Sequence, residues 1–532
     1  MVGRLASDRP RRGRVRLGLV ALLVALVGAC AGPVNEIVED RFDISEASGT
    51  PDVADVTDIG GGDVPLTGVV PMEASDGVAA IGETLWIRGK SFGRQPTVVV
   101  GGRPATVLGR SRDGGIFTRV PPLTPSGTQP VVVTNEIGKG ERPISVRRYA
   151  VTLGPGTGQI GLAEVGPDGP IAAGRSAVPG GGFLALSGDG RAAYVIQAAR
   201  GLMQVLELPA PGGPKVVYQL ELGPAPPIAV ETAGHAPVVA VVRADDVELV
   251  DTTSPLHPAR STPRTLPGEV RAAHVVAAAI SPDGKMLAVA TEAGNRVVLL
   301  DLVPYRHAGV IGSIDVLPDV RESSLADVAF SPSGDTLWVL SGDTPRNRAV
   351  APQPTELRAI RLGGDPQSLA HLEVTRTVRI DAAADPVRLS AGRAAPLASG
   401  ATIRLPPERA TMFVSAGMRP SAATPAAGAP PPALAAPPAS VSGSAAVFRV
   451  GAEDTATAAV VVPGRVGLPD LTYDGRWLMV PEALADGSIR ILAIAADGRP
   501  VTTAVRPVEV IPGGPAELPP AARPVPELYV QP

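Results

Sequence analysis

Residues 281–302 read SPDGKMLAVATEAGNRVVLLDL, and this stretch decides the fold. It holds two apolar runs, and the turn before the first of them centres on the pair Asp283-Gly284. An Asp-Gly pair between apolar runs predicts a hairpin, because glycine readily adopts the left-handed backbone that a tight turn needs. With its neighbouring apolar stretches, the sequence predicts four short antiparallel strands: Val275–Ile280, Met286–Ala290, Arg296–Leu302 and Val310–Val316.

The same turn recurs along the chain at a regular interval. Further copies begin at Ser187, Ser331 and Thr472, and each precedes a short apolar run. The steps from 187 to 281, from 281 to 331 and from 331 to 472 are 94, 50 and 141 residues, which approximate two, one and three periods of about 47. Weaker copies lie at 233–236 and 406–409. A four-stranded repeat of this length is typical of a β-propeller blade.

The repeat resembles the YVTN or lactonase-like propellers. It shares their S-P-D-G-K turn, the apolar strand that follows, and a later V-x-x-x-D at Val297–Asp301 and Val247–Asp251. The resemblance covers roughly residues 180–510 and implies a propeller. Six blades can be counted. A seventh would combine Gln159–Val165 with Leu528–Val530 and close the ring. We expect six or seven blades and favour seven.

Upstream of the repeat, residues 66–152 alternate short strands with turns and resemble the IPT/TIG family of immunoglobulin-like domains. The family pattern runs G-x-x-L-x-I-x-G-x-x-F-G, V-x-V-G-G, V-P and V-x-V-T-N with a late Gly. The matching residues are Gly82, Leu85, Ile87, Gly89, Phe92, Gly93, Val98, Val100, Gly101, Gly102, Val120, Pro121, Val131, Val133, Thr134, Asn135 and Gly138. The resemblance implies an antiparallel sandwich without catalytic residues, which acts as a binding domain or as a spacer.

The N-terminus has the pattern of an export signal. Residues 1–29 hold six arginines, then the apolar run Leu17–Val27 and two small residues. Val27-Gly28-Ala29-Cys30 resembles the lipobox of bacterial lipoproteins, which implies lipidation of Cys30 and cleavage before it. The alternative is an ordinary signal peptide with a cysteine near its cut. Because Ala31 follows instead of Asp, we expect anchoring in the outer membrane.

Three further stretches have the composition of connecting segments. Residues 30–65 are acidic and predict a disordered tether; Asp52, Asp55 and Asp58 alternatively suggest calcium binding, but no glycine lies amid them as in a calcium loop. Gly154–Gly158 lacks the Lys of a phosphate loop and is interpreted as the linker between the two domains. Residues 419–440 are rich in Ala and Pro and predict an insert, either without function or presenting a Pro-rich ligand.

The residues that carry catalysis are sparse. None of the five histidines (His235, His257, His274, His307 and His371) has metal-ligand spacing, and the Asp-Gly pairs are explained as turns. We therefore predict no catalytic, cofactor or metal residues, and only Cys30 as a modified site. A net charge of -4 gives no basic field for nucleic acid.

The sequence thus predicts an all-β chain, with a sandwich at 66–152 followed by a six- or seven-bladed propeller at 153–532. Its 61 glycines, 58 prolines and 3% aromatic residues agree with many short strands joined by turns. We expect an exported, lipid-anchored protein that binds or scaffolds an envelope protein or glycan, and that is not an enzyme. Two alternatives remain, a lactonase-like hydrolase outside the cytoplasm, with His274 as the residue to test, and a purely adhesive element.

Overall fold

The structure is a computed structural model. It describes residues 64–531 except the following: 73–76, 137, 155–157, 167–168, 209–212, 234–235, 304–306, 318–324, 343–354, 363–368, 370–371, 381–382, 391–411, 419–444, 451–455, 463–464, 468, 473–476, 485–487, 496–507 and 512–526. The predicted signal, Cys30, most of the tether and the Ala/Pro-rich insert lie outside the described residues.

The first folded part is the predicted sandwich of two antiparallel sheets. One sheet has the order β1 (Leu66–Pro71), β3 (Thr84–Gly89), β7 (Ile116–Arg119) and β6 (Val107–Arg110). The other has the order β5 (Arg103–Ala105), β4 (Thr97–Val100), β8 (Gly127–Thr134) and β9 (Lys139–Gly154), with β2 (Val78–Ala80) parallel to β9. Alternate side chains such as Leu85, Val98 and Val131 point inward and are fully buried between the sheets, as the alternating sequence predicts.

The rest of the described chain forms six sheets of four or five strands, and a seventh group of four strands continues the sandwich sheet through β9, so the prediction of a propeller is confirmed and seven blades are present. Six blades are each formed by consecutive strands; the first two are β12 (Gly181–Leu186), β13 (Ala192–Gln197), β14 (Leu202–Glu207) and β15 (Lys215–Glu221), and then β16 (Ala229–Thr232), β17 (Val238–Val242), β18 (Asp246–Asp251), β19 (Ala259–Arg260) and β20 (Arg264–Thr265). The third is β21 (Val275–Ile280), β22 (Met286–Thr291), β23 (Arg296–Asp301) and β24 (Gly309–Asp315), and the fourth is β25 (Leu325–Phe330), β26 (Thr336–Ser341), β27 (Glu356–Arg361) and β28 (Val374–Arg379). The fifth is β29 (Ala383–Ser390), β30 (Met412–Met418), β31 (Ala445–Val450) and β32 (Ala456–Val462), and the sixth is β33 (Arg465–Val466), β34 (Asp470–Leu471), β35 (Trp477–Ala483), β36 (Ile489–Ala495) and β37 (Val508–Ile511).

The seventh sheet joins the two ends of the propeller. Its order is β38 (Glu527–Val530), the second half of β9, β10 (Gln159–Gly166) and β11 (Gly169–Ala177). The predicted partnership of Gln159–Val165 with Leu528–Val530 is therefore found, with β9 lying between them. Innermost strands of successive blades contact one another from β38 through β12, β16, β21 and β25 to β29. The next step runs from β30 and β31 to β33, and β34 contacts β38, which closes the ring.

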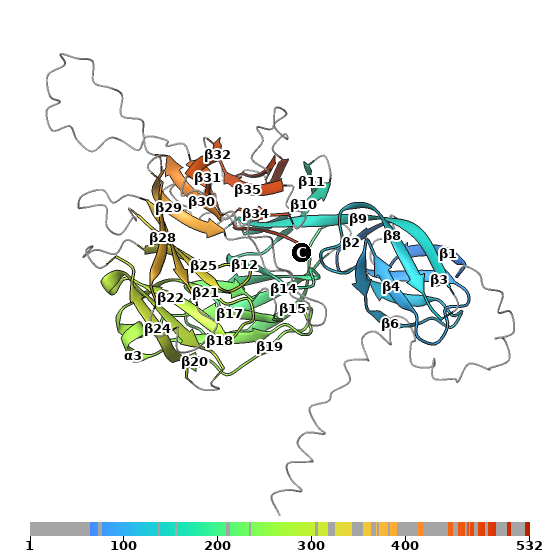
Figure 1. The fold of residues 1–532 in the computed structure, drawn as a ribbon, viewed down its shortest axis with the longest axis horizontal. Coiled ribbons are helices and arrows are strands. Elements are labelled where there is room, and N and C mark those ends of the chain that lie inside the picture. Colours follow the sequence, from blue (N-terminus) through green and yellow to red (C-terminus); the bar gives the residue numbers. More distant parts are fainter. Residues whose placement is uncertain are drawn as a thin grey trace, which may run out of the picture.

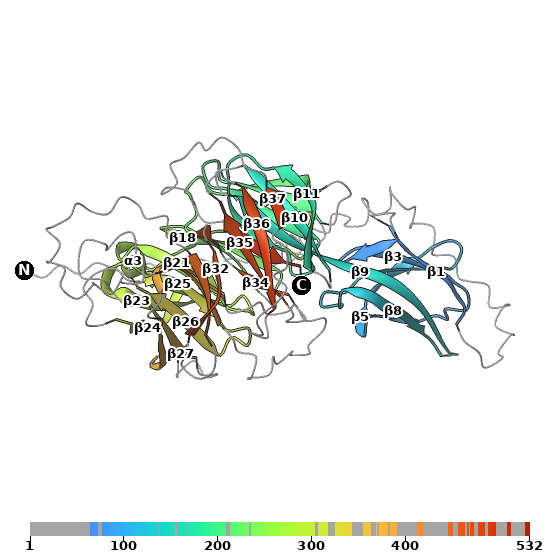
Figure 2. The same cartoon turned by 90° about the horizontal axis from the view of Figure 1, so that it is seen from above.

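Strand β9 belongs to both parts of the molecule. Its first half pairs with β8 of the sandwich, and its second half pairs with β10 and β38 of the propeller. Figures 1 and 2 show it running from one part into the other. Gly154 faces Gln159 across the β9–β10 pair, so the glycine-rich stretch joins two strands of one blade and is not the interdomain linker that we expected. The boundary predicted between 152 and 153 falls inside β9.

Candidate functional site

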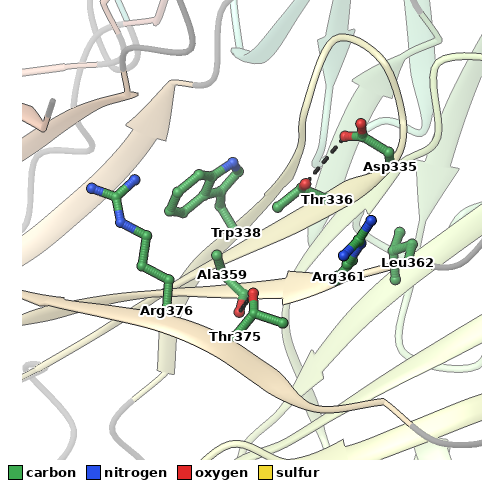
Figure 3. Close-up of a pocket in the computed structure, with 8 residues that line it drawn as sticks. All are labelled: Asp335, Thr336, Trp338, Ala359, Arg361, Leu362, Thr375 and Arg376. Atoms are coloured by element: carbon green, nitrogen blue, oxygen red, sulfur yellow. Dashed lines mark hydrogen bonds between the residues drawn. The ribbon is translucent and has the colours of Figure 1, made fainter. Parts of the chain in front are cut away.

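A hollow of about 470 Å³ lies on the sheet β25–β28 and is lined by charged, hydroxyl and apolar side chains (Figure 3). It follows from the strand register. Trp338 of β26, Ala359 of β27 and Arg376 of β28 face one another across three strands. Because the small Ala359 stands between two large side chains, the sheet surface is depressed there. Thr336 and Arg361 form the next row, and Asp335, Leu362 and Thr375 complete the lining.

The hollow combines cationic, aromatic and hydroxyl groups. The Arg376 guanidinium carbon lies 5.8 Å from the centre of the buried Trp338 ring, within the range of a cation–π contact. Arg361 is exposed at the end of its strand. The Thr375 hydroxyl donates to the Ala359 carbonyl at 3.2 Å, which holds it over the bulge between β27 and β28. These groups can bind an anion that carries a ring.

The one acidic side chain of the hollow is already satisfied by the turn that precedes β26. Burial tends to raise the pKa of Asp335, but hydroxyls of Ser333, Ser331 and Thr336 donate to its Oδ1 at 2.6, 2.9 and 3.1 Å and together lower that pKa below its usual value. Asp335 is therefore a carboxylate at neutral pH and an acceptor within its own turn. It is poorly suited to donate a proton to a substrate.

The junction of sandwich and propeller is held by buried hydrogen bonds and close packing. The buried Arg148 of β9 donates to the Thr124 carbonyl of the sandwich at 2.9 Å. The buried Gln531 accepts from the Tyr149 amide at 2.9 Å and donates to the Gly190 carbonyl at 2.6 Å. A Cβ on Gly82 would lie 2.5 Å from Arg191 Cγ, so only glycine permits this close approach. Ala80 of the sandwich also belongs to a hydrophobic cluster of the propeller.

A buried ion cluster lies in the blade β16–β20, and no motif or spacing in the sequence indicated it. Arg243 donates to Asp246 at 2.8 Å, to Glu248 at 2.7 Å and to the Ala225 carbonyl at 3.1 Å, and Arg260 donates to the other Glu248 oxygen at 2.5 Å. Both Arg243 and Glu248 are almost fully buried. Each charged group is paired within the cluster, and the Ala225 carbonyl links it to the segment between β15 and β16, so the cluster supports the fold instead of offering a site.

The structure brings none of the predicted candidate residues into one site. His274 precedes β21, has a φ of 57° and an exposed side chain, and its Nδ1 lies 3.7 Å from Glu292 Oε2. His257 packs its ring 5.2 Å from that of Tyr218, and His307 lies in an isolated bridge with Thr265. His235 and His371 lie outside the described residues.

The described part of the chain shows neither a cluster of metal ligands nor a membrane-spanning helix. No group of three or more His, Cys, Asp or Glu residues in it is placed to hold a metal ion. No helix in the same residues has the length and apolar character needed to cross a membrane.

Comparison with known proteins identifies the first domain. Residues 66–143 match the model of the IPT/TIG domain family. Among curated proteins, none matches the sequence of this chain.

Solved structures resemble the chain at low sequence identity. A candidate 6-phosphogluconolactonase from Bacteroides fragilis is 13% identical over 72% of this chain and 98% of its own, with a TM-score of 0.45. A similar candidate from Bacteroides uniformis is 15% identical over 72% and 99%, with a TM-score of 0.44. The β-propeller domain of Cps50 (Swd1) from Myceliophteria thermophila is 14% identical over 65% and 96%, with a TM-score of 0.39. Likeness at this level carries no argument about activity. The described residues are nearly all β, and in them an IPT/TIG domain at residues 66–143 is joined to a seven-bladed propeller.

Proposed function

We propose that the protein is a cell-envelope lipoprotein, anchored through Cys30, which binds or scaffolds an envelope protein or glycan. The observation that carries the proposal is the shared strand β9. A strand that pairs in both domains fixes their relative orientation more firmly than a flexible linker does. Fixed orientation suits a platform that holds a partner at a set place relative to its anchor.

The N-terminal sequence supports the anchor. A lipid on Cys30 would be followed by an acidic segment of about 35 residues before β1 begins at Leu66. A segment of that composition and length holds the folded domains off the membrane surface while it keeps them close to it. The sandwich then lies nearest to the anchor in sequence.

Substitution of Cys30 tests the anchor. In envelopes of the producing cell, Cys30→Ser should move from the membrane fraction to the soluble fraction or remain as the uncleaved precursor, because a serine cannot form the thioether to the lipid. Ala31→Ser is the matched control and should stay in the membrane fraction. The measurement is fractionation with a mass of the mature N-terminus. Equal behaviour of the two variants would favour an ordinary signal peptide and refute the anchor.

Crosslinking tests the scaffold role. Gentle crosslinking of the anchored protein, followed by mass spectrometry, should recover a stoichiometric envelope protein or a defined glycan. The scaffold role would be contradicted if neither a protein nor a glycan were recovered and if the native chain hydrolysed a lactone that His274→Ala did not hydrolyse. That result would favour the lactonase-like alternative.

A further inference from the structure

We propose that the hollow on the sheet β25–β28 binds a uronic acid, that is, a sugar ring carrying one carboxylate. The inference goes beyond the proposed function, since it requires neither the lipid anchor nor a protein partner. It rests on three properties of the hollow: its charge, its hydroxyl groups and its apolar floor.

The charge of the lining suits a monoanion. The described lining holds the exposed Arg361, the Arg376 guanidinium stacked on Trp338, and the Asp335 carboxylate, which the hydroxyls of its own turn already satisfy. Guanidinium groups match the planar geometry of a carboxylate and bind it through paired hydrogen bonds. A phosphate monoester carries nearly two negative charges, and Asp335 would repel it more strongly than it repels a carboxylate. The lining therefore favours a carboxylate over a phosphate.

The two threonines are arranged to accept hydrogen bonds. Thr336 donates its hydroxyl proton to Asp335 Oδ1 at 3.1 Å, and Thr375 donates its own to the Ala359 carbonyl at 3.2 Å. A hydroxyl that has given its proton keeps its oxygen lone pairs as acceptors. Both oxygens can therefore receive the hydroxyl protons of a sugar, while the arginines supply donors for its carboxylate.

The floor of the hollow is apolar and its size is suitable. Trp338, Ala359 and Leu362 are buried and present carbon to the space above them. Figure 3 shows Ala359 between the Trp338 indole and the Arg376 side chain. Apolar surface beside a few placed polar groups is the usual construction of a small-ligand site, and about 470 Å³ lies within the range of such sites.

Calorimetric titration of the full chain in detergent tests the inference. The probes are the trimers of galacturonate and of mannuronate, and the matched controls are their methyl esters, which keep the ring and lose the charge. We expect at least one acid trimer to bind, and its ester to bind at least about tenfold more weakly. Failure of both acids, or equal binding of acid and ester, would overturn the proposal.

Two variants locate the binding. Arg361→Gln should weaken binding by about tenfold, because it removes an exposed guanidinium without altering the core. Arg175→Gln removes an exposed arginine from β11 of another blade and should leave binding unchanged. Ala359→Leu should abolish binding by filling the hollow, with unchanged circular dichroism as its folding control. Unchanged affinity in Arg361→Gln would place the ligand elsewhere and overturn the proposal.

The affinities of the uronate trimer and of the single sugar acid distinguish two sources of the ligand. Tighter binding of the trimer than of the single sugar acid supports a polymeric envelope glycan as the source. Equal binding supports a free sugar acid. Both results support a uronate site, and neither depends on whether Cys30 carries a lipid.

Discussion

At the scale of single residues, the repeated turn is held by the hydroxyl of its first residue. Ser187 accepts from the Ala192 amide at 2.9 Å, and Ser281 accepts from the Met286 amide at the same distance. In the sheet β33–β37, Thr472 accepts from the Trp477 amide at 2.9 Å. The hydroxyl thus satisfies the amide five positions later, where the next strand begins. This explains why Ser or Thr opens the turn in blades of otherwise different sequence.

Ser281→Ala should lower the midpoint of thermal unfolding by about 1–2 °C near neutral pH, because a hydrogen bond of this kind is worth about 1 kcal/mol. Ser281 also donates to Asp283 Oδ1 at 2.7 Å. Burial raises the pKa of Asp283, but the hydrogen bond from Ser281, the Lys285 amide and the Lys285 charge together lower it below its usual value.

The penalty of Ser281→Ala should therefore depend on pH. A carboxyl whose pKa is lower in the folded state contributes stability above its unfolded value of 3.8, and loses it as the pH falls through the folded value. The difference between Ser281→Ala and the native chain should thus be larger at pH 6 than at pH 2.5. The control is Ser313→Ala, an exposed serine on β24 of the same blade, which should have no effect at either pH. A penalty independent of pH would refute the role given to Asp283.

At the scale of strands, the sequence predicts the blades well where a turn motif and two apolar runs lie close together. The strands predicted from residues 275–316 agree with β21–β24 to within one residue at nearly every end. The sequence predicted β9 poorly, because a strand with partners in two domains has no local signature. The apolar residues of its second half resemble the end of one domain, and the glycines after Leu153 resemble a linker. The pairings of β9 with β10 and with β38 show otherwise.

Gln531→Ala should destabilise the closure of the ring. The substitution leaves the buried Tyr149 amide and Gly190 carbonyl without their side-chain partner, at a cost of about 2–4 kcal/mol. We expect a lower unfolding midpoint and faster proteolysis near the C-terminus, measured by scanning calorimetry and limited digestion. Gln219→Ala on the outer strand β15 removes the same side chain from an exposed position and should behave as the native chain does. Equal midpoints for the two variants would contradict this role of Gln531.

At the scale of the whole molecule, the hollow on the sheet β25–β28 is a site that the sequence did not predict. Trp338, Ala359 and Arg376 are ordinary strand residues in sequence, separated by 21 and 17 positions. Their chemistry emerges only from the register of three strands. We predicted no catalytic residues because no candidate side chains have the spacing of a known motif along the sequence. Such spacing cannot reveal a site whose residues come from different strands of a sheet. Fold and domain order were predictable because each repeat carries its own turn, whereas this site has no such local motif.

The two domains should unfold as one unit, since they share β9 and a hydrophobic cluster. Insertion of Gly-Gly-Ser between Arg147 and Arg148 interrupts the shared strand, and we expect it to split a single calorimetric transition into two. The same insertion after Gly102, whose Cβ position faces open space, should leave one transition. Two transitions in the native chain would contradict the coupling.

The closing strand also sets an order of events during synthesis. Tyr149 bonds to Gln531 across a separation of 382 residues, and bringing such distant points together costs about 5 kcal/mol of chain entropy. The sandwich can fold as soon as β9 has emerged, and one edge of the second half of β9 then stays unpaired until β38 has been synthesised. An unpaired strand edge invites pairing with other chains. A nascent molecule is therefore exposed to misassociation until β38 has been synthesised, and a chain truncated before β38 would hold a complete sandwich beside a ring that cannot close.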